Sequence, residues 1–228
     1  MDFDVITNSL KKGFDVWKDN LVAYIVAMIL IAIIGAVLFG IASVGGAFGL
    51  VAAAAAGSYA GMGLSFAAMG VALLLCLLIV GPLAYGLYFM AIKGTRGEKV
   101  KIGDVFYAFK SVSTYIRVLI FFIVYGLLMA LFSIIPIIGS IIFMILFIYT
   151  AYIYIMTPSE GIIYALKESF NVAKDNIVMT IVAVLVYYVL IFIGSLLFGI
   201  GLLVTAPIAW IFVAYVLKEL KPGIKDES

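Results

Sequence analysis

The charged residues of this chain are confined to a few short segments, and long apolar tracts separate them. All 14 basic and all 12 acidic residues lie in four stretches, residues 2–19, 93–117, 160–175 and 218–227. A charge near the centre of a bilayer costs at least about 2.5 kcal/mol, so charge-free tracts of this length are typical of membrane spans. Each tract is long enough to cross and return, which places every charge on one face of the membrane.

The composition excludes several classes of protein. With 228 residues, 67% of them hydrophobic, and a mean hydropathy of +1.31, residues 1–228 are expected to form a single integral membrane domain. A net charge of +2 argues against nucleic acid as a partner. Histidine is absent and Cys76 is the sole cysteine, so we expect no disulfide, metal site or cofactor. No serine has a histidine to activate it, so we expect no catalytic residue and no enzyme activity.

The hydropathy pattern predicts an all-α, polytopic membrane bundle of six transmembrane helices. The expected spans are Leu21–Ser43, Leu64–Ile92, Ile116–Ile135, Ile137–Met156, Ile177–Gly199 and Gly201–Leu217. The Gly/Ala-rich segment 45–63 is too long for a tight turn. One interpretation is a loosely helical outer connection, and the other is a re-entrant or helix-dimerising segment, because glycines spaced by four residues let helices approach closely.

Each charged stretch also carries apolar residues at helical spacing. This pattern predicts three amphipathic helices that lie in the membrane interface next to the spans. The three stripes are Phe3, Ile6, Leu10, Phe14, Trp17 and Leu21; Val105, Phe106, Phe109, Val112 and Ile116; and Ile162, Ile163, Leu166, Phe170 and Ala173. Residues 157–160, with the sequence TPSE, fit a capping box that starts the last of these helices.

The two ends of the chain share an internal repeat. Residues 10–22 (LKKGFDVWKDNLV) and residues 166–178 (LKESFNVAKDNIV) are identical at eight of thirteen positions. Pro82 and Pro207 each precede a lysine by eleven residues. A weaker middle copy around Ala108-Phe109-Lys110 suggests three parallel hairpin repeats, of about residues 3–93, 104–156 and 159–218. All copies start from the same face, unlike the inverted repeats of many carriers.

The basic residues predict the orientation of the chain. The central loop holds six basic residues against two acidic ones, and the opposite turns hold no lysine or arginine. The positive-inside rule then places both termini and all charged loops in the cytoplasm, in a multi-pass protein of the cell (plasma) membrane. The six basic residues, which we take as candidates for lipid headgroup binding, are Lys93, Arg96, Lys99, Lys101, Lys110 and Arg117.

Three further groups of residues have both a structural and a functional interpretation. The repeated helix-start motif, Lys18-Asp19-Asn20 and Lys174-Asp175-Asn176, suits a helix N-terminus, and its alternative role is contact with a headgroup or cation. Pro82 and Pro207 are expected to kink their helices for packing, with a gating hinge as the alternative. The tyrosines expected near mid-membrane, which are Tyr125, Tyr187 and Tyr188, suit interhelical hydrogen bonds, and the alternative is a polar substrate path.

Three features together carry a resemblance to a known group of proteins. They are the FxVxKDN segment before the first span, Gly81-Pro82-Leu83-Ala84-Tyr85-Gly86 in the second span, and the ALKESF segment before the fifth. The chain resembles uncharacterised six-helix prokaryotic membrane proteins, the YciC-like and related domain-of-unknown-function families. These are similar to the membrane domain of some glycerophosphodiester phosphodiesterases. The resemblance implies the fold, and it brings no active-site residues because that catalytic domain is absent.

The expected function is therefore non-enzymatic. The leading hypothesis is a lipid-interacting or membrane-organising protein whose partners are membrane lipids. One alternative is a transporter or channel for a small or amphiphilic solute, although no intramembrane charge is present for ion coupling. The other alternative is a subunit of a larger membrane complex, with a second copy or another membrane protein as partner.

Overall fold

The computed structural model describes residues 4–196, 199–224 and 226–227, and in these residues all regular structure is helical. Two short π-helices (η1, η2) and one 3-10 helix (η3) interrupt or join the α-helices. Six of the described helices are long and apolar enough to cross a membrane, which confirms that part of the prediction. The elements in chain order are α1 (Asp4–Asp19), α2 (Leu21–Ala42), η1 (Ser43–Phe48), α3 (Gly49–Ala55), α4 (Tyr59–Leu75), η2 (Cys76–Val80), α5 (Gly81–Thr95), η3 (Ile102–Lys110), α6 (Val112–Phe132), α7 (Ile138–Phe147), α8 (Thr150–Met156), α9 (Gly161–Asp175), α10 (Ile177–Leu196) and α11 (Leu202–Leu220).

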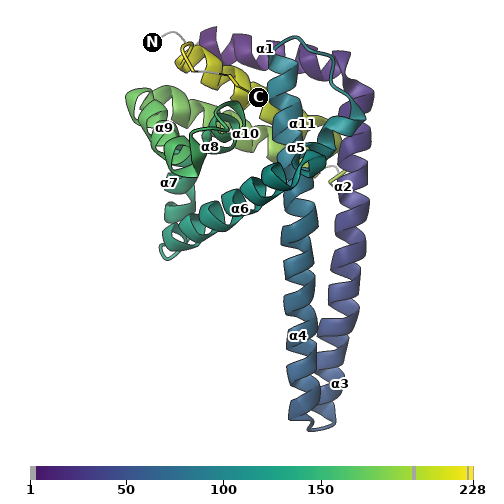
Figure 1. Ribbon diagram of the computed structural model, residues 1–228. Helices are drawn as coiled ribbons and strands as arrows, with labels where there is room; N and C mark the ends of the chain where they lie inside the picture. Colours follow the sequence, from purple (N-terminus) through teal and green to yellow (C-terminus); the bar gives the residue numbers. More distant parts are fainter. Residues whose placement is uncertain (1–3, 197–198, 225, 228) are drawn as a thin grey trace.

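The first two spans form one long hairpin, residues 21–95, that extends well beyond the rest of the molecule (Figure 1). Its second arm is a continuous helical run of 37 residues, Tyr59–Thr95, which is about 55 Å long. The arms are joined by a tight turn at residues 56–58, where Gly57 has a φ of 64° that favours glycine. Most of the Gly/Ala-rich segment 45–63, expected to be a loosely helical connection or a re-entrant or helix-dimerising segment, is helix that ends one arm and begins the other.

Small residues hold the end of the long hairpin together. A Cβ added to Gly61 would lie 2.8 Å from the Cβ of Ala53, and one added to Gly49 would lie 2.7 Å from Ser65 Oγ. These glycines therefore let the two arms approach closely, as small residues do at helix contacts in membranes. We call the outer part of the hairpin, residues 43–75 (η1, α3 and α4), the distal arm.

The remaining helices, α1, η3 and α6–α11, pack together with α5 into a compact part at the opposite end of the long hairpin (Figure 1). Every residue of α8 is buried, and α5 and α11 are buried over most of their length. Rings from α5, α6 and α8 meet at Tyr85, Phe121 and Tyr154, with centroids 5.3 to 6.4 Å apart. Gly86 lets η3 lie directly on α5, because an added Cβ would overlap the carbonyl of Val105.

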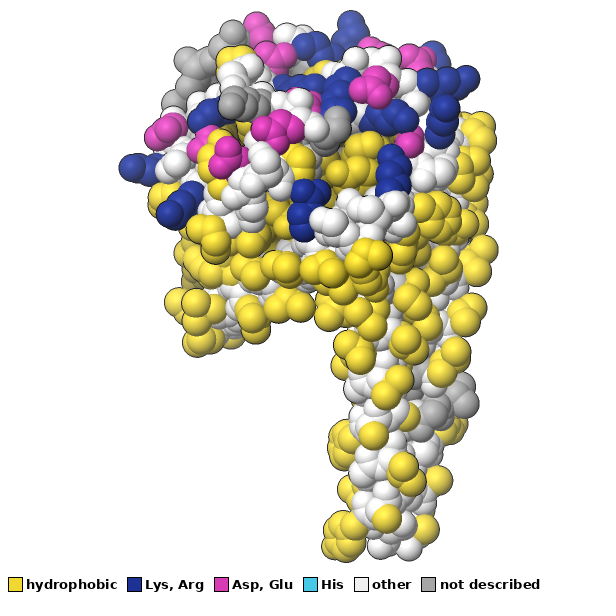
Figure 2. Space-filling model, in the orientation of Figure 1, with side chains coloured by type: hydrophobic (Ala, Val, Ile, Leu, Met, Phe, Trp, Pro, Cys, Tyr) yellow, Lys and Arg dark blue, Asp and Glu magenta, His cyan; other side chains and the backbone are white. Residues whose placement is uncertain are grey.

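Charge and apolar surface separate along the long axis of the molecule. Figure 2 shows the lysine, arginine, aspartate and glutamate side chains gathered at the end that carries α1 and the C-terminus. The distal arm has no charged residue, and Figure 2 shows its described surface as apolar side chains among uncharged side chains and backbone. The segregation of charge that is evident in the sequence is therefore also a segregation in space.

The predicted stripes match the buried faces only in part. α1 buries Ile6, Ser9, Gly13 and Trp17, whereas Phe14 is 47% exposed. The reason is Gly13, which lets α1 approach α11 so closely that an added Cβ would lie 3.2 Å from the Phe212 nitrogen. Gly13, the smallest residue of α1, therefore determines which face of this helix is buried. Phe3, the first residue of this stripe, lies outside the described residues.

Two predictions about the other stripes were wrong. The middle stripe is not an α-helix, because residues 102–110 form a 3-10 helix that buries Val105 and Ala108 and leaves Phe106 exposed. The expected capping box at residues 157–160 is also absent, since α9 starts at Gly161 without a side-chain cap. The Thr157 hydroxyl instead donates to the carbonyl of Ile153 at the C-terminal end of α8.

The two prolines occupy different settings. Pro82 is at the start of α5, directly after the π-helical turn Cys76–Val80. Proline has no backbone N–H, so a carbonyl in the preceding turn loses its usual helical partner, and a local change of helix type is expected there. Pro207 is buried inside α11, which continues from Leu202 to Leu220. The fifth span was expected to end at Gly199, and residues 197–198 lie outside the described part of the chain.

Candidate functional site

The structure divides the six candidate basic residues into two groups. Lys93 forms an ion pair with Asp104 at 2.8 Å, and Arg96 pairs with Asp226. The same carboxylate of Asp104 accepts a hydrogen bond from the Lys101 backbone at 2.8 Å. Lys93 and Arg96 therefore fasten the central loop and the C-terminal segment to α5, and their charges are already compensated by protein groups.

Arg117 and Lys110 also have partners within the protein. The Arg117 guanidinium donates to the carbonyl of Pro158 at 2.8 Å, which ties α6 to the segment before α9. The Lys110 ammonium lies over two rings, 5.0 Å from the centroid of Phe89 and 5.3 Å from that of Tyr107. Such cation–π contacts stabilise a charge at a partly exposed site.

Lys99 and Lys101 are different, because both are exposed and neither side chain has an acidic partner among the described residues. Together with Lys18 they line a groove of about 650 Å³ at the corner between α1 and α2. The remaining wall is mostly apolar, and its members are Leu21, Val22, Ala23, Val100 and Ile102, with Asp19 and Asn20 at the corner. Three ammonium groups and an apolar wall thus share one open concavity, which we call the basic groove.

Asn20 builds the corner of the basic groove. Its side-chain nitrogen donates to the carbonyl of Val16 at 2.9 Å, and its side-chain oxygen accepts from the backbone N–H of Val100 at 2.9 Å. One amide therefore closes the end of α1 and holds the loop that carries Lys99 and Lys101. The helix-start motif was expected to cap α2, but α2 begins at Leu21, its N-cap residue Asn20 makes no side-chain capping bond, and Asp19 is exposed.

The second copy of the motif has the same local structure. Asn176 donates from its side chain to the carbonyl of Val172 at 3.1 Å, as Asn20 does to Val16. The backbone φ is −121° at Asn20 and −127° at Asn176. Lys174 and Asp175 are exposed at the end of α9, and the basic groove is lined by the first motif alone.

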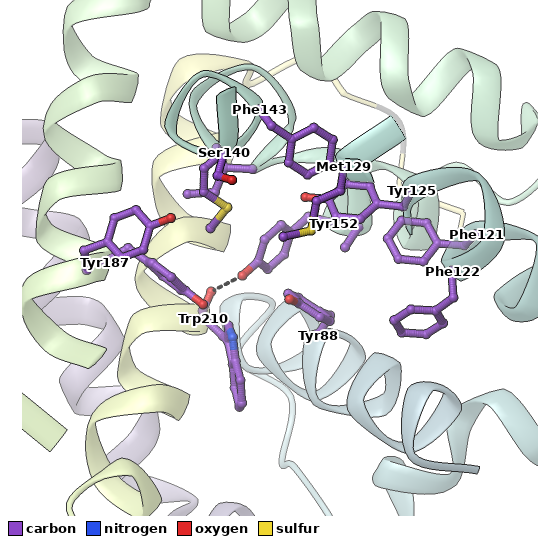
Figure 3. A pocket seen from close by; sticks show the side chains of 14 residues that line it. Tyr88, Phe121, Phe122, Tyr125, Met129, Ser140, Phe143, Tyr152, Tyr187 and Trp210 are labelled. Atoms are coloured by element: carbon purple, nitrogen blue, oxygen red, sulfur yellow. Dashed lines mark hydrogen bonds between the residues drawn. The ribbon is translucent and has the colours of Figure 1, made fainter. Parts of the chain in front are cut away.

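A second concavity lies inside the compact part, where α5–α8, α10 and α11 meet (Figure 3). It has a volume of about 190 Å³, and no lysine, arginine, aspartate or glutamate lines it. The lining is Tyr88, Phe121, Phe122, Tyr125, Met129, Ser140, Phe143, Met144, Ile148, Ala151, Tyr152, Tyr187, Tyr188 and Trp210. The Tyr152 hydroxyl donates to the Trp210 carbonyl at 3.0 Å, and that of Tyr125 to the Phe147 carbonyl at 3.3 Å.

The sequence pointed to Tyr125, Tyr187 and Tyr188 but not to this aromatic cavity. The lining comes from six helices that are far apart in the chain, so no local pattern marks it. Tyr125 makes the interhelical bond expected of it, while Tyr187 and Tyr188 contact one another at 5.7 Å between ring centroids. Among the described residues, no group of three or more aspartate, glutamate or cysteine side chains is placed to hold a metal ion.

No protein-family model, curated protein or solved structure matches this chain. The resemblance to the YciC-like families therefore stays a prediction. The functional proposal rests on the basic groove, the aromatic cavity and the shape of the molecule.

Proposed function

We propose that this chain is a multi-pass membrane protein that binds anionic lipid headgroups in the basic groove and organises the leaflet on its charged side. The observation that carries the proposal is the position of Lys18, Lys99 and Lys101 around one concavity with an apolar wall. A lipid phosphate would meet the ammonium groups, and its acyl chains would meet Leu21 and Val22. Each basic group beside an anionic leaflet contributes about 1 kcal/mol, reduced by salt.

The same proposal includes the orientation and the interfacial helices. The positive-inside rule places the charged end of the molecule, with both termini, in the cytoplasm. The exposure of Phe14 on α1 (47%) and of Phe170 on α9 (40%) supports an interfacial position, since each ring lies outside the protein core beside exposed lysines. In this arrangement α1 and α9 rest on the membrane surface.

We also retain three parallel hairpin repeats as part of the proposal. The support is the matching helix ends at Asn20 and Asn176, and the helical state of both repeated segments, which lie in α1 and α9. The middle copy has the least support, because η3 is a 3-10 helix where α1 and α9 are α-helices.

The test compares two matched double variants. Lys99→Gln with Lys101→Gln removes two charges from the basic groove, whereas Lys11→Gln with Lys167→Gln removes two exposed charges outside it. Each purified protein is mixed with equal amounts of phosphatidylglycerol and phosphatidylcholine, and the retained lipid is counted by native mass spectrometry. We expect the groove variant to lose preference for phosphatidylglycerol about fivefold or more at low salt, and the control to keep it. An equal loss in both, or no loss in either, contradicts the proposal.

The aromatic cavity favours a second function, the binding or passage of an uncharged amphiphile. Its lining of tyrosine hydroxyls and rings without a charged group suits a ligand that has an apolar body and a hydrogen-bonding end. Flux of a soluble or amphiphilic solute into vesicles containing the purified protein, lost in Tyr88→Trp, supports transport. A role as subunit of a larger complex would be shown instead by a stable partner in the membrane.

A further inference from the structure

The distal arm stands clear of the compact part. α3 and α4 pack on each other and on η1, and α4 also packs on α2 and η2; neither packs substantially on α6–α11. Figure 1 shows that none of the helices α6–α11 reaches the tip of the long hairpin. α4 has 17 residues, so the molecule extends about 26 Å beyond the level of Cys76. The two shorter hairpins, residues 112–156 and 177–220, therefore end at a shallower level than the first.

A bilayer can be placed on this shape in two ways. If the compact part crosses the whole membrane, the distal arm stands in water on the far side. That placement exposes Phe48 (74%), Leu64 (74%) and Leu73 (70%) to solvent on a surface with no charged residue. Soluble surfaces rarely present an apolar patch of this extent.

In the second placement the distal arm lies in the bilayer. One leaflet of hydrocarbon is about 15 Å thick and its headgroup layer adds about 5–8 Å. The arm, at about 26 Å, is therefore long enough to cross the far leaflet and reach its interface. The compact part is then immersed about one leaflet deep, and its charged end lies at the surface.

The turn of the second hairpin suits the interior of a bilayer. Ile134, Ile135 and Ile137 are 58 to 75% exposed there, and the Ser133 hydroxyl is bonded back to its own helix. The backbone N–H groups of residues 134, 135, 138 and 139 all donate within the turn, at 2.7 to 3.3 Å. A turn in hydrocarbon must satisfy most of its backbone internally. Here Pro136 has no N–H, only the Ile137 N–H of residues 134–139 is without a bond among the described residues, and the turn has no charged group.

The turn of the long hairpin has a different chemistry. Tyr59 is 88% exposed at its tip and is the only tyrosine or tryptophan of the distal arm. Tyrosine and tryptophan concentrate at membrane–water interfaces. By contrast, the described part of the turn of the third hairpin exposes Ile200 (72%). The tip of the first hairpin therefore suits the far interface, and those of the others suit the membrane interior.

We propose that only the long hairpin crosses the bilayer, and that residues 112–156 and 177–220 enter the leaflet on the charged side and return. The molecule then fills one leaflet with its compact part and the other with two helices, and so acts as a wedge that favours curved membrane. This deepens the proposed membrane-organising function by naming its physical action. It depends on the depth of the three hairpins and on the shape of the molecule, so it can be tested separately from headgroup binding in the basic groove.

The test measures the depth of the three turns. Single cysteines replace Tyr59, Ile134, Ile200 or Lys99 in a Cys76→Ala background, and the protein is reconstituted in vesicles. We expect Tyr59→Cys and Lys99→Cys to react with a membrane-impermeant maleimide from opposite sides. Ile134→Cys and Ile200→Cys should react from neither side, yet react fully after unfolding in SDS, which shows that the thiols are intact.

Spin labels at the same positions give an independent measurement. Labels at residues 134 and 200 should be relaxed strongly by oxygen and weakly by a water-soluble nickel complex, as expected near the bilayer centre. Reaction of Ile134→Cys and Ile200→Cys from the same side as Tyr59→Cys would overturn the inference and establish six full crossings. The phosphatidylglycerol preference of wild-type protein is measured in parallel, so that failure of one proposal is distinguished from failure of the other.

Discussion

The long hairpin and the compact part both contain apolar spans, but only the compact part has spans that are mostly buried within the protein. In the hairpin, 17% and 11% of the most hydrophobic windows of its two arms are buried within the protein. In the compact part the values are 61% for Ile138–Met156 and 56% for Leu202–Leu220, whereas Val112–Phe132 (11%) and Ile177–Leu196 (22%) are as little buried as the hairpin arms. The first region therefore presents most of its side chains to its surroundings, whereas the second contains helices packed against protein. Hydropathy measures the tendency to leave water, and it does not distinguish lipid from protein as the destination.

A charge placed at the inner end of the distal arm should have the largest effect. Leu73 is 70% exposed and 14 residues from Tyr59, so in the inferred placement it lies about 21 Å from the far interface, near the bilayer centre. We expect Leu73→Lys to make the free energy of membrane insertion less favourable by about 2.5–3.5 kcal/mol. The measurement is the inserted fraction in a membrane-insertion assay.

Leu64→Lys is the matched control for this prediction. Leu64 is 74% exposed but only five residues from Tyr59, so its lysine can reach the interface by extending its side chain. We expect Leu64→Lys to make the free energy of membrane insertion less favourable by less than about 1 kcal/mol. Equal tolerance of both variants would mean that the arm stands in water and that the two regions do not differ in depth.

Within the compact part, tight helix contact should make one glycine indispensable. A Cβ at residue 86 would overlap the Val105 backbone, so Gly86→Ala must push η3 away from α5. We expect a loss of about 1–3 kcal/mol of stability, seen as a lower midpoint of thermal unfolding in detergent. Gly126→Ala on α6 is the control, because nothing lies within 4 Å of its added Cβ. A similar change in both variants would show that close packing does not set the stability of this region.

The two copies of the helix-start motif should differ in a smaller way. Asn20 makes two side-chain hydrogen bonds and Asn176 makes one. We expect Asn20→Ala to lower the free energy of unfolding by about 1–2 kcal/mol, and Asn176→Ala to lower it by about 0.5–1 kcal/mol. The free energy of unfolding of each variant checks this, and Asn20→Ala should also speed proteolysis at Lys99. The reverse order would mean that the Val100 contact contributes little.

The smallest effect is expected for the exposed pair of Lys12 and Glu219, which are 2.9 Å apart with 49% and 42% of their side chains exposed. The hydrogen bond and charge of Glu219 raise the pKa of Lys12 above 10.5. A raised pKa means that the stabilisation is present below the unfolded-state pKa and is lost as pH rises through the folded-state value. Solvent screens this pair, so Glu219→Gln should change stability by less than about 0.5 kcal/mol at pH 7. A larger loss would show that the junction of α1 and α11 depends on charge.

Much of the helical organisation was predictable from the sequence. The segregation of charge predicted six helices able to cross a membrane, because a buried charge is costly enough to leave a clear local pattern. The repeat around Asn20 and Asn176 also corresponds to two helix ends at which the asparagine side chain donates to the carbonyl four residues earlier. These features depend on neighbouring residues, so the local sequence is sufficient to determine them.

Only the tertiary structure decided which charges are free and where the glycines act. Arg96 meets Asp226 across 130 positions of the chain, and Lys101 shares its groove with Lys18. Gly13 and Gly86 select the faces of α1 and α5 that are buried, against the apolar stripe in the case of α1. Such contacts depend on the distances between helices, which are set by packing across the whole molecule. The charge pattern and the positions of the apolar helices follow from the sequence, while the contacts between those helices follow from their assembly.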